Sequence, residues 1–217
     1  MRFVLLIPIL AAALQADPVT VVATRSEFGT ADLFYSFDVP ASPGPVTAQI
    51  RGGTSCLGGI PQCGDQLATA KIDLNMDLYT SGPARDGIGL VQLVLNGDGS
   101  AGGATQVSGA IGPYSIGGCA KGLTCHLTGY FPFELGVPFT IDLSGFANAN
   151  PQFMGDAGFF ASASLQLYEL PTQAGNPVGA PVQIDLVPEP GSAGLAFTGL
   201  SALIFFGIRR RRNLPSI

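Results

Sequence analysis

Hydrophobic and polar residues alternate strictly over residues 71–79 (KIDLNMDLY). Alternation with a period of two places the apolar side chains on one face of an extended strand and the polar ones on the other. Similar alternation occurs at 46–50, 139–143, 164–168 and 182–186. Residues 19–24 and 33–39 are richer in β-branched and aromatic side chains, a composition typical of buried strands. The pattern predicts a chain built mainly from β-strands.

Glycine, proline and asparagine separate these segments. Residues 90–95 run into the sequence Asn-Gly-Asp-Gly at 96–99, which predicts a turn, with 105–111 returning as an antiparallel partner. Pro40, Pro132, Pro138 and Pro181 suit edge strands or strand starts, because proline cannot donate a backbone hydrogen bond. We count about nine to eleven short strands and no convincing helix before residue 191. The predicted fold is all-β, an antiparallel β-sandwich or jelly-roll-like domain over residues 17–187.

The N-terminal segment has the pattern of a secretory signal peptide. Residues 1–16 read MRFVLLIPILAAALQA, with Arg2 before an apolar run that is interrupted only by Pro8. Small residues follow, and cleavage after Ala16 or Ala13 would release the mature chain. The run is too short to span a bilayer with these flanks. We therefore expect export through the Sec translocon.

The C-terminal segment predicts one transmembrane helix. Residues 191–208 carry no charge, and Arg209, Arg210, Arg211 and Arg212 follow directly. A helix of this length reaches about 27 Å, just enough for a hydrocarbon core of about 30 Å. The positive-inside rule places the arginines in the cytoplasm. The precursor is thus expected to span the inner membrane once, with its C-terminus cytoplasmic.

Three parts of this segment, residues 188–213, together resemble the PEP-CTERM sorting signal of bacteria that make exopolysaccharide. They are the motif Pro188, Glu189 and Pro190, the helix 191–208, and the arginine cluster 209–212. The resemblance implies recognition by an exosortase, a membrane enzyme that removes the tail and delivers the protein to the cell surface or beyond it. It covers only the last ~25 residues and concerns delivery, not activity. A plain permanent anchor is the alternative.

Composition narrows the classes of function. The 217 residues carry a net charge of −5, but residues 17–190 contain five cations and all fifteen carboxylates, a charge of −10. A domain this acidic is not expected to bind nucleic acid, which requires many Lys and Arg residues. The single histidine, His126, disfavours His-based catalysis and multi-His metal sites. We expect no cofactor and no metal.

The four cysteines lie in two glycine-rich segments, Cys56 with Cys63 and Cys119 with Cys125. In an exported chain an even number of cysteines predicts disulfides, and four cysteines allow three connectivities. We favour the local pairs Cys56–Cys63 and Cys119–Cys125, because each brackets a loop that can bend back on itself. The alternative, a zinc site, needs closer spacing than these pairs have.

The remaining candidates for a catalytic or calcium site have simpler structural interpretations. Asp73 and Asp77 lie about 13 Å apart along one strand face, too far for paired-carboxylate catalysis, and are interpreted as a solvated face. Asn96, Asp98 and Ser100 resemble half of a calcium loop, but Val107 occupies the position of its final glutamate. No nucleophile elbow or P-loop occurs in the sequence. We therefore expect a non-enzymatic protein.

Two functions remain. The first is a structural protein of the cell surface or extracellular matrix, sorted by an exosortase and associated with extracellular polysaccharide or biofilm. The second is a carbohydrate-binding or adhesion module of the β-sandwich type, in which Tyr79, Tyr114 or Tyr130 stacks against sugars. The absence of tryptophan weakens the second hypothesis, because tryptophan offers the largest stacking surface.

Overall fold

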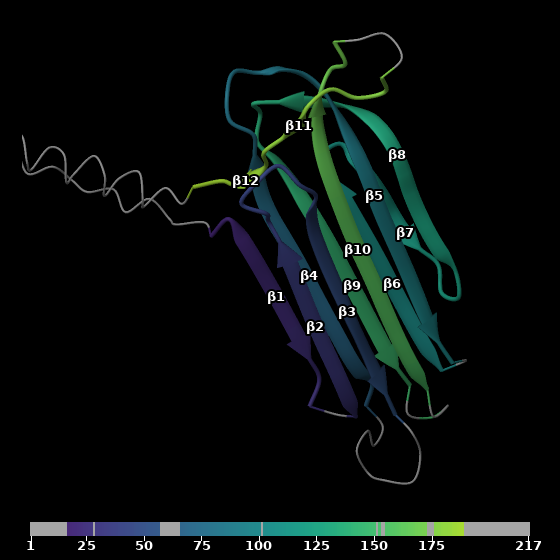
Figure 1. Ribbon diagram of the computed structural model, residues 1–217. Helices are drawn as coiled ribbons and strands as arrows, with labels where there is room; N and C mark the ends of the chain where they lie inside the picture. Colours follow the sequence, from purple (N-terminus) through teal and green to yellow (C-terminus); the bar gives the residue numbers. More distant parts are fainter. Residues whose placement is uncertain are drawn as a thin grey trace, which may run out of the picture. The chain divides into compact units, whose positions relative to one another are not determined.

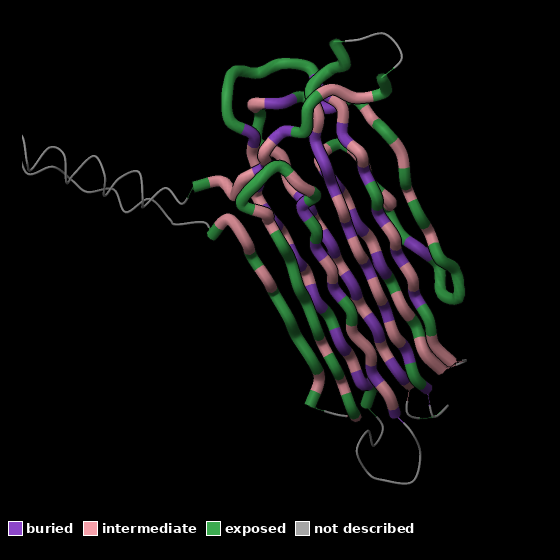
Figure 2. Tube along the Cα trace, viewed as in Figure 1, coloured by how far each residue is buried: buried purple, intermediate pink, exposed green. Residues whose placement is uncertain are grey.

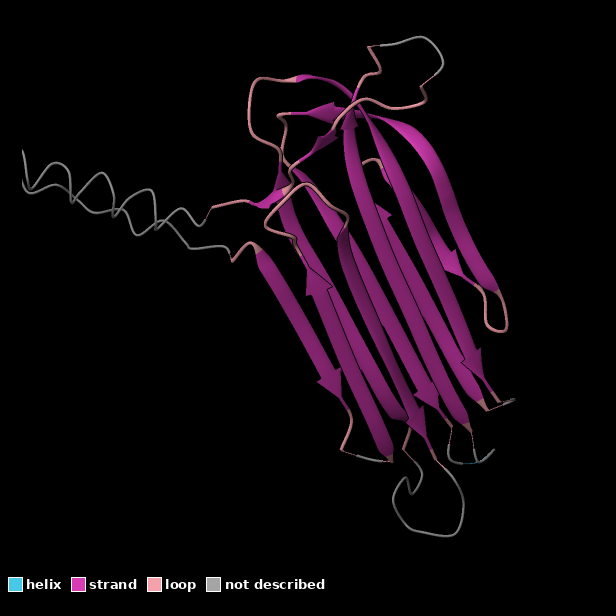
Figure 3. Cartoon of the chain, in the orientation of Figure 1, coloured by secondary structure: helices cyan, strands magenta, loops and turns pink. Residues whose placement is uncertain are grey.

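The computed structural model describes residues 17–188 except 28, 57–65, 101, 151, 153–154 and 173–175. This part of the chain consists of twelve β-strands joined by loops and contains no α-helix (Figures 1 and 3). Its strands are all antiparallel and form two sheets, so the predicted all-β, sandwich-like class is confirmed. Within the described residues no helix is long and apolar enough to cross a membrane. The predicted helix 191–208 and the predicted signal peptide 1–16 lie outside them.

Each sheet has five long strands and one short one. The first sheet has the order β1-β4-β9-β6-β7, with β12 also paired to β4: β1 (Val19–Arg25), β4 (Ala68–Tyr79), β9 (Phe139–Ala149), β6 (Gly103–Ile111), β7 (Tyr114–Cys119) and β12 (Asp185–Leu186). The second has the order β2-β3-β10-β5-β8, with β11 also paired to β10: β2 (Thr30–Asp38), β3 (Val46–Ser55), β10 (Asp156–Glu169), β5 (Arg85–Gly99), β8 (Thr124–Leu135) and β11 (Pro181–Val182). Strands that are neighbours in the sequence often belong to different sheets.

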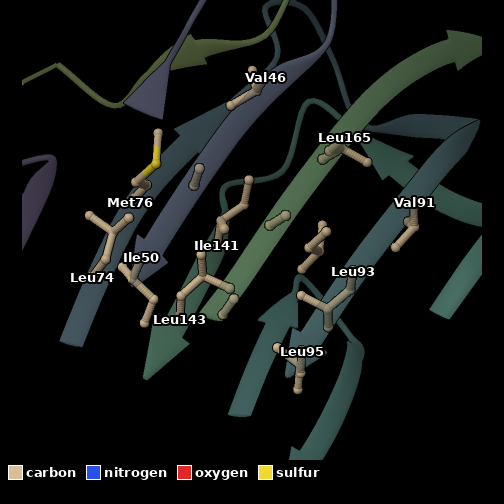
Figure 4. Packing of buried hydrophobic residues seen from close by; sticks show 14 of the residues in the cluster. Val46, Ile50, Leu74, Met76, Val91, Leu93, Leu95, Ile141, Leu143 and Leu165 are labelled. Carbon is tan, nitrogen blue, oxygen red and sulfur yellow. The ribbon is translucent and has the colours of Figure 1, made fainter. Parts of the chain in front are cut away.

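The hydrophobic core lies between the two sheets. Buried and less buried residues alternate along the central strands, which Figure 2 shows as alternating bands. Strand β4 contributes Leu74 and Met76 from the first sheet, and β5 contributes Leu93 and Leu95 from the second (Figure 4). Both sheets and this core lie within one compact unit, Pro18–Val187, which therefore has what it needs to fold on its own.

The prediction of a turn at 96–99 and a hairpin to 105–111 is wrong. Strand β5 continues through Gly99 and pairs with β10 and β8, whereas β6 belongs to the other sheet. The two glycines in this stretch allow neighbouring segments of the chain to approach closely and do not form a turn. A Cβ atom on Gly97 would come within 2.5 Å of Thr105 Oγ1, and one on Gly99 within 2.7 Å of the Asp156 carbonyl oxygen.

Three further expectations about strands need correction. Residues 19–24 and 33–39 were predicted as buried strands, but β1 and β2 are edge strands and mostly exposed. The strand predicted at 182–186 is divided into β11 and β12, which pair with opposite sheets. Between them the side chain of Gln183 donates to the Pro40 carbonyl at 2.7 Å, while Ile184 is buried in the core. The strands are also longer than expected, up to 15 residues in β5.

A disulfide closes one edge of the sandwich. Cys119 at the end of β7 is bonded to Cys125 in β8, with a Cα–Cα distance of 5.7 Å, as predicted. Because β7 and β8 are edge strands of different sheets, this bond links the two sheets. Cys56 is also disulfide-bonded, and its predicted partner, Cys63, lies outside the described residues. The prediction for the prolines is confirmed at three positions, since Pro132 lies in edge strand β8, Pro138 directly precedes β9 and Pro181 begins β11, whereas Pro40 lies in the loop after β2.

Candidate functional site

The outer face of the first sheet is polar. Its carboxylate Asp73 contacts polar side chains beside it on the same face. Asp73 lies 2.7 Å from the Lys71 ammonium and accepts a hydrogen bond of 2.6 Å from the Ser144 hydroxyl. Partial burial raises the pKa of Asp73, but hydrogen bonds from Lys71 and Ser144 outweigh it and leave the pKa below its ordinary value of 3.8. Asp77 lies on the same face of β4, four residues further along the strand, as predicted. The arrangement is that of a solvated face.

The residues weighed as metal ligands are separated. Within the described ranges, no three His, Cys, Asp or Glu side chains come together in a group able to hold a metal ion. Asn96 and Asp98 lie in the extended strand β5, where the Asn96 amide donates to Thr124 Oγ1 at 2.8 Å. Asp98 accepts a hydrogen bond of 2.7 Å from the backbone amide of Gly99. His126 is exposed on β8 and is paired across the sheet with Val94.

The three tyrosines proposed for sugar stacking do not come together. Tyr79 ends β4 and pairs with Asp185 in β12. Tyr114 lies on β7 and packs against Phe131, with ring centroids 4.7 Å apart, while its hydroxyl donates to the Pro132 carbonyl. These contacts tie Tyr114 into the β7–β8 edge. Tyr130 alone presents a largely free ring, with 53% of the residue exposed.

Tyr130 has an aromatic neighbour that the sequence did not indicate. The ring of Tyr168, on β10, lies 6.4 Å from that of Tyr130, on β8, across the intervening strand β5. Together with Ile88, Pro132 and Leu170 these two residues form what we call the tyrosine patch, on the outer face of the second sheet. Alternation at 164–168 indicates that Tyr168 points outward, but only the strand order places it beside Tyr130.

The tyrosine patch borders a shallow hollow of about 570 Å³. The hollow is lined by Tyr130, Pro132 and Leu170, and by the carboxylates Asp86 and Glu134, which are paired across β5 and β8. Aromatic rings with carboxylates at their border suit a ligand that has both apolar faces and hydroxyl groups. Sugars have this character.

The predicted sorting motif lies at the border of the described residues. Pro188 is the last of them, and Glu189, Pro190 and the arginines 209–212 lie outside. Both ends of the sandwich are attached to the same residue of β4. The Asp77 amide donates to the Pro18 carbonyl at 2.7 Å, and the Val187 amide donates to the Asp77 carbonyl at 3.0 Å. The chain therefore enters and leaves this unit at one end of the sandwich.

Comparison with known proteins assigns no family. The sequence matches no protein-family profile and no curated protein. Among solved structures, one of infectious bursal disease virus, Gx strain, aligns at 15% sequence identity and a TM-score of 0.18. The alignment covers 77% of this chain and 35% of that one, so this chain spans about a third of the viral protein's length.

Proposed function

We propose that this chain is the precursor of a non-enzymatic surface or matrix protein, whose β-sandwich is delivered outside the cell by an exosortase. The proposal rests on the C-terminal boundary of the described sandwich. Among the described residues, the last backbone hydrogen bond is donated by Val187, directly before Pro188. Cleavage near the motif 188–190 would therefore leave the sandwich complete. The signal peptide, the Sec translocon and the exosortase would act in that order, and association with extracellular polysaccharide would follow.

The two neighbouring chain ends support this proposal. Signal peptidase would cut near Asp17 and the exosortase near Pro190. Each cut would fall just outside a residue that is hydrogen-bonded to Asp77, namely Pro18 or Val187. A domain held at one end presents its sheet faces and its opposite loops to the surroundings. This is the arrangement that a surface or matrix protein requires.

The mass of the protein extracted from the cell surface tests delivery. We expect an N-terminus near Asp17 and a C-terminus within a few residues of Pro190. Replacing all four arginines 209–212 by serine should leave the uncleaved precursor in the membrane fraction, because the cytoplasmic anchor of the signal is lost. Replacing Arg85, a cation within the sandwich, by serine serves as the control and should leave sorting unchanged. Surface protein that retains the tail 209–217 would indicate a permanent anchor instead.

The tyrosine patch favours carbohydrate binding as a second candidate function. Binding of the purified unit 17–187 to a glycan array, with calcium present, should weaken when Tyr130 is replaced by alanine. Tyr79→Ala is the matched control, because Tyr79 lies on the other sheet. Absence of binding on the array would remove this candidate, and turnover of any polysaccharide would contradict the non-enzymatic assignment.

A further inference from the structure

A row of four residues crosses the outer face of the second sheet and leaves its centre without side chains. Asp32 on β2 pairs with Gly53 on β3, Gly53 pairs with Gly158 on β10, and Gly158 pairs with Asp98 on β5. Strands lie about 4.8 Å apart, so the two aspartates stand about 14 Å from each other across the two glycines. We call this row the glycine trough.

One side of the glycine trough is walled by the next row of residues, Phe34, Arg51 and Phe160. The guanidinium of Arg51 stacks over the Phe34 ring, 4.7 Å from its centroid, which fixes both side chains. At the other side Asp156 is held by Ser100, whose backbone amide donates to its carboxylate at 3.0 Å. The hydroxyl and amide of Ser100 keep the pKa of Asp156 below its ordinary value, so this carboxylate remains charged.

The trough is hollowed on both sides of the glycines. A hollow of about 710 Å³ is lined by Phe34, Arg51 and Phe160, and a second of about 360 Å³ by Asp98 and Asp156. The two share Asp32, Gly53 and Gly158 and so form one continuous depression. Ser55, which pairs with Asp156 and so lies on the outer face, also lines the smaller hollow, and its buried hydroxyl has no hydrogen-bond partner among the described residues. Such a hydroxyl is a group that a polar ligand or a water would satisfy.

Packing does not require a glycine at position 158. The nearest atom to a Cβ placed there is the Gly52 carbonyl oxygen at 3.6 Å, an ordinary contact. Glycine weakens a strand by about 0.5–1 kcal/mol relative to residues with a side chain. The open floor at Gly158 therefore costs stability without serving the core. This fits a floor that is occupied by a ligand.

We propose that the glycine trough binds a neutral oligosaccharide, an inference that rests on the carbohydrate-binding function proposed above and gives it a site apart from the tyrosine patch, at the other end of β10. Aromatic rings such as those of Phe34 and Phe160 stack against the C–H faces of sugars. The carboxylates of Asp32 and Asp98 accept hydrogen bonds from sugar hydroxyls, and the guanidinium of Arg51 donates hydrogen bonds to them.

The charge of the trough selects neutral sugars. Three carboxylates, those of Asp32, Asp98 and Asp156, line the trough with the cation Arg51. Lys121 lies close enough to Asp156 to lower its pKa, so the carboxylates still outnumber the cations, in a region 17–190 that carries −10 overall. Uronic-acid polymers would be repelled by this field. The trough lies near the start of β10, whereas β11 and the chain ends lie toward the other end of the strands, so the proposed site points away from the attachment point (Figure 1).

Calorimetric titration of the purified, oxidised unit 17–187 tests this site. The probes are neutral hexasaccharides of β-1,4-glucose, β-1,3-glucose, α-mannose and β-galactose, with an alginate hexasaccharide as the anionic comparison. We expect at least one neutral probe to bind and alginate not to bind. Gly158→Val should weaken binding by about tenfold or more, because the valine side chain fills the floor. Phe34→Ala should have a similar effect from the exposed edge strand, where it does not disturb the core.

Ser162→Val is the matched control, since Ser162 lies on the same strand and face, two rows from the trough. Its affinity should stay within about twofold of the wild type. No binding of any neutral probe, tighter binding of alginate, or unchanged binding by Gly158→Val would overturn the proposal. Binding that is lost in Tyr130→Ala but retained in Gly158→Val would assign the sugar to the tyrosine patch. The delivery experiment is independent of all these outcomes.

Discussion

The ring of Phe159 occupies a space in the core that only glycine can leave open. Phe159 belongs to β10, and Gly145 lies opposite it on β9, in the other sheet. A Cβ atom on Gly145 would lie 2.2 Å from two ring carbons, and one on Gly52, on the neighbouring strand β3, would lie 2.5 Å from the ring. The phenyl ring thus fits over two backbone segments that have no side chains.

We therefore expect Gly145→Ala to lower the free energy of unfolding by about 1–3 kcal/mol, because the added methyl overpacks the core. Urea denaturation of the unit 17–187 measures the change. The second substitution Phe159→Leu should recover part of the loss, since a smaller side chain leaves room for the methyl. Gly158→Ala, at an open position on the same sheet as the ring, should not destabilise the unit and should raise the free energy of unfolding by about 0.5–1 kcal/mol, the cost of a glycine in a strand. Equal costs at both glycines would contradict this explanation.

Asp73 gives a pH dependence whose direction follows from its contacts. Burial raises its pKa, but hydrogen bonds from Lys71 and Ser144 bring the folded-state pKa below the ordinary 3.8. The contribution to stability is therefore present above pH 3.8 and is lost as the pH falls through the folded-state pKa. Thermal unfolding of the wild type and Asp73→Asn from about pH 7 to pH 2 should show a stability difference that shrinks in acid. A difference that does not vary with pH would exclude Asp73 as its source.

Residue alternation predicted which side chains face the core but not which side chains meet. The inward positions of β4, such as Leu74 and Met76, are those that the period of two indicates. Gly145 beneath Phe159, and Tyr168 beside Tyr130, depend on which strands are neighbours. The glycine trough is a stronger case, since its four residues come from four strands. Local sequence carries little information about such pairings, because they are set by long-range packing.

The hairpin wrongly predicted at 96–111 also depended on which strands are neighbours. Asn-Gly and Asp-Gly at 96–99 would indicate a hairpin turn if the next strand paired with β5 in the same sheet. Here the chain crosses to the other sheet after Gly99. The disulfide at the β7–β8 connection was predictable, because its two cysteines lie close in sequence. That the bond joins two sheets was not, since this again depends on strand order.

The β7–β8 edge is held by the disulfide and by an aromatic group. Tyr114 packs against Phe131 and also against Phe133, whose ring contacts Phe139 edge-on at 5.0 Å. Replacing Cys119 and Cys125 together by alanine should lower the free energy of unfolding by about 2–3 kcal/mol, from the entropy of the released loop. Urea denaturation under oxidising conditions measures this loss. An unchanged midpoint would mean that the aromatic contacts alone close the edge.

At the scale of the whole molecule, the two sides of the sandwich differ. On one side β7 and β8 are bonded to each other through Cys119 and Cys125. On the other side β1 and β2 are edge strands, and Tyr35 and Phe37 point toward the core side yet remain 47% and 42% exposed. The core is thus sealed along one edge and incompletely covered along the other.

This asymmetry predicts a gradient of local stability across the molecule. Backbone amides exchange with solvent through local opening, and opening is easiest where few buried contacts must be broken. We expect deuterium exchange, followed by mass spectrometry of peptides from the unit 17–187, to be fastest in β1 and β2. It should be slowest in β9 and β10, which are paired on both sides and contribute heavily to the core.

Strands β7 and β8 should be intermediate in the wild type, because the disulfide limits their separation. In the double variant Cys119→Ala, Cys125→Ala they should exchange about as fast as β1 and β2, while β9 and β10 stay protected.

If β1 and β2 were instead protected as strongly as the central strands, this edge would have to be covered in solution, with pairing to a second copy as the simplest source. A concentration series of the same exchange experiment would then detect the pairing, since protection of an intermolecular edge falls on dilution and that of an intramolecular one does not.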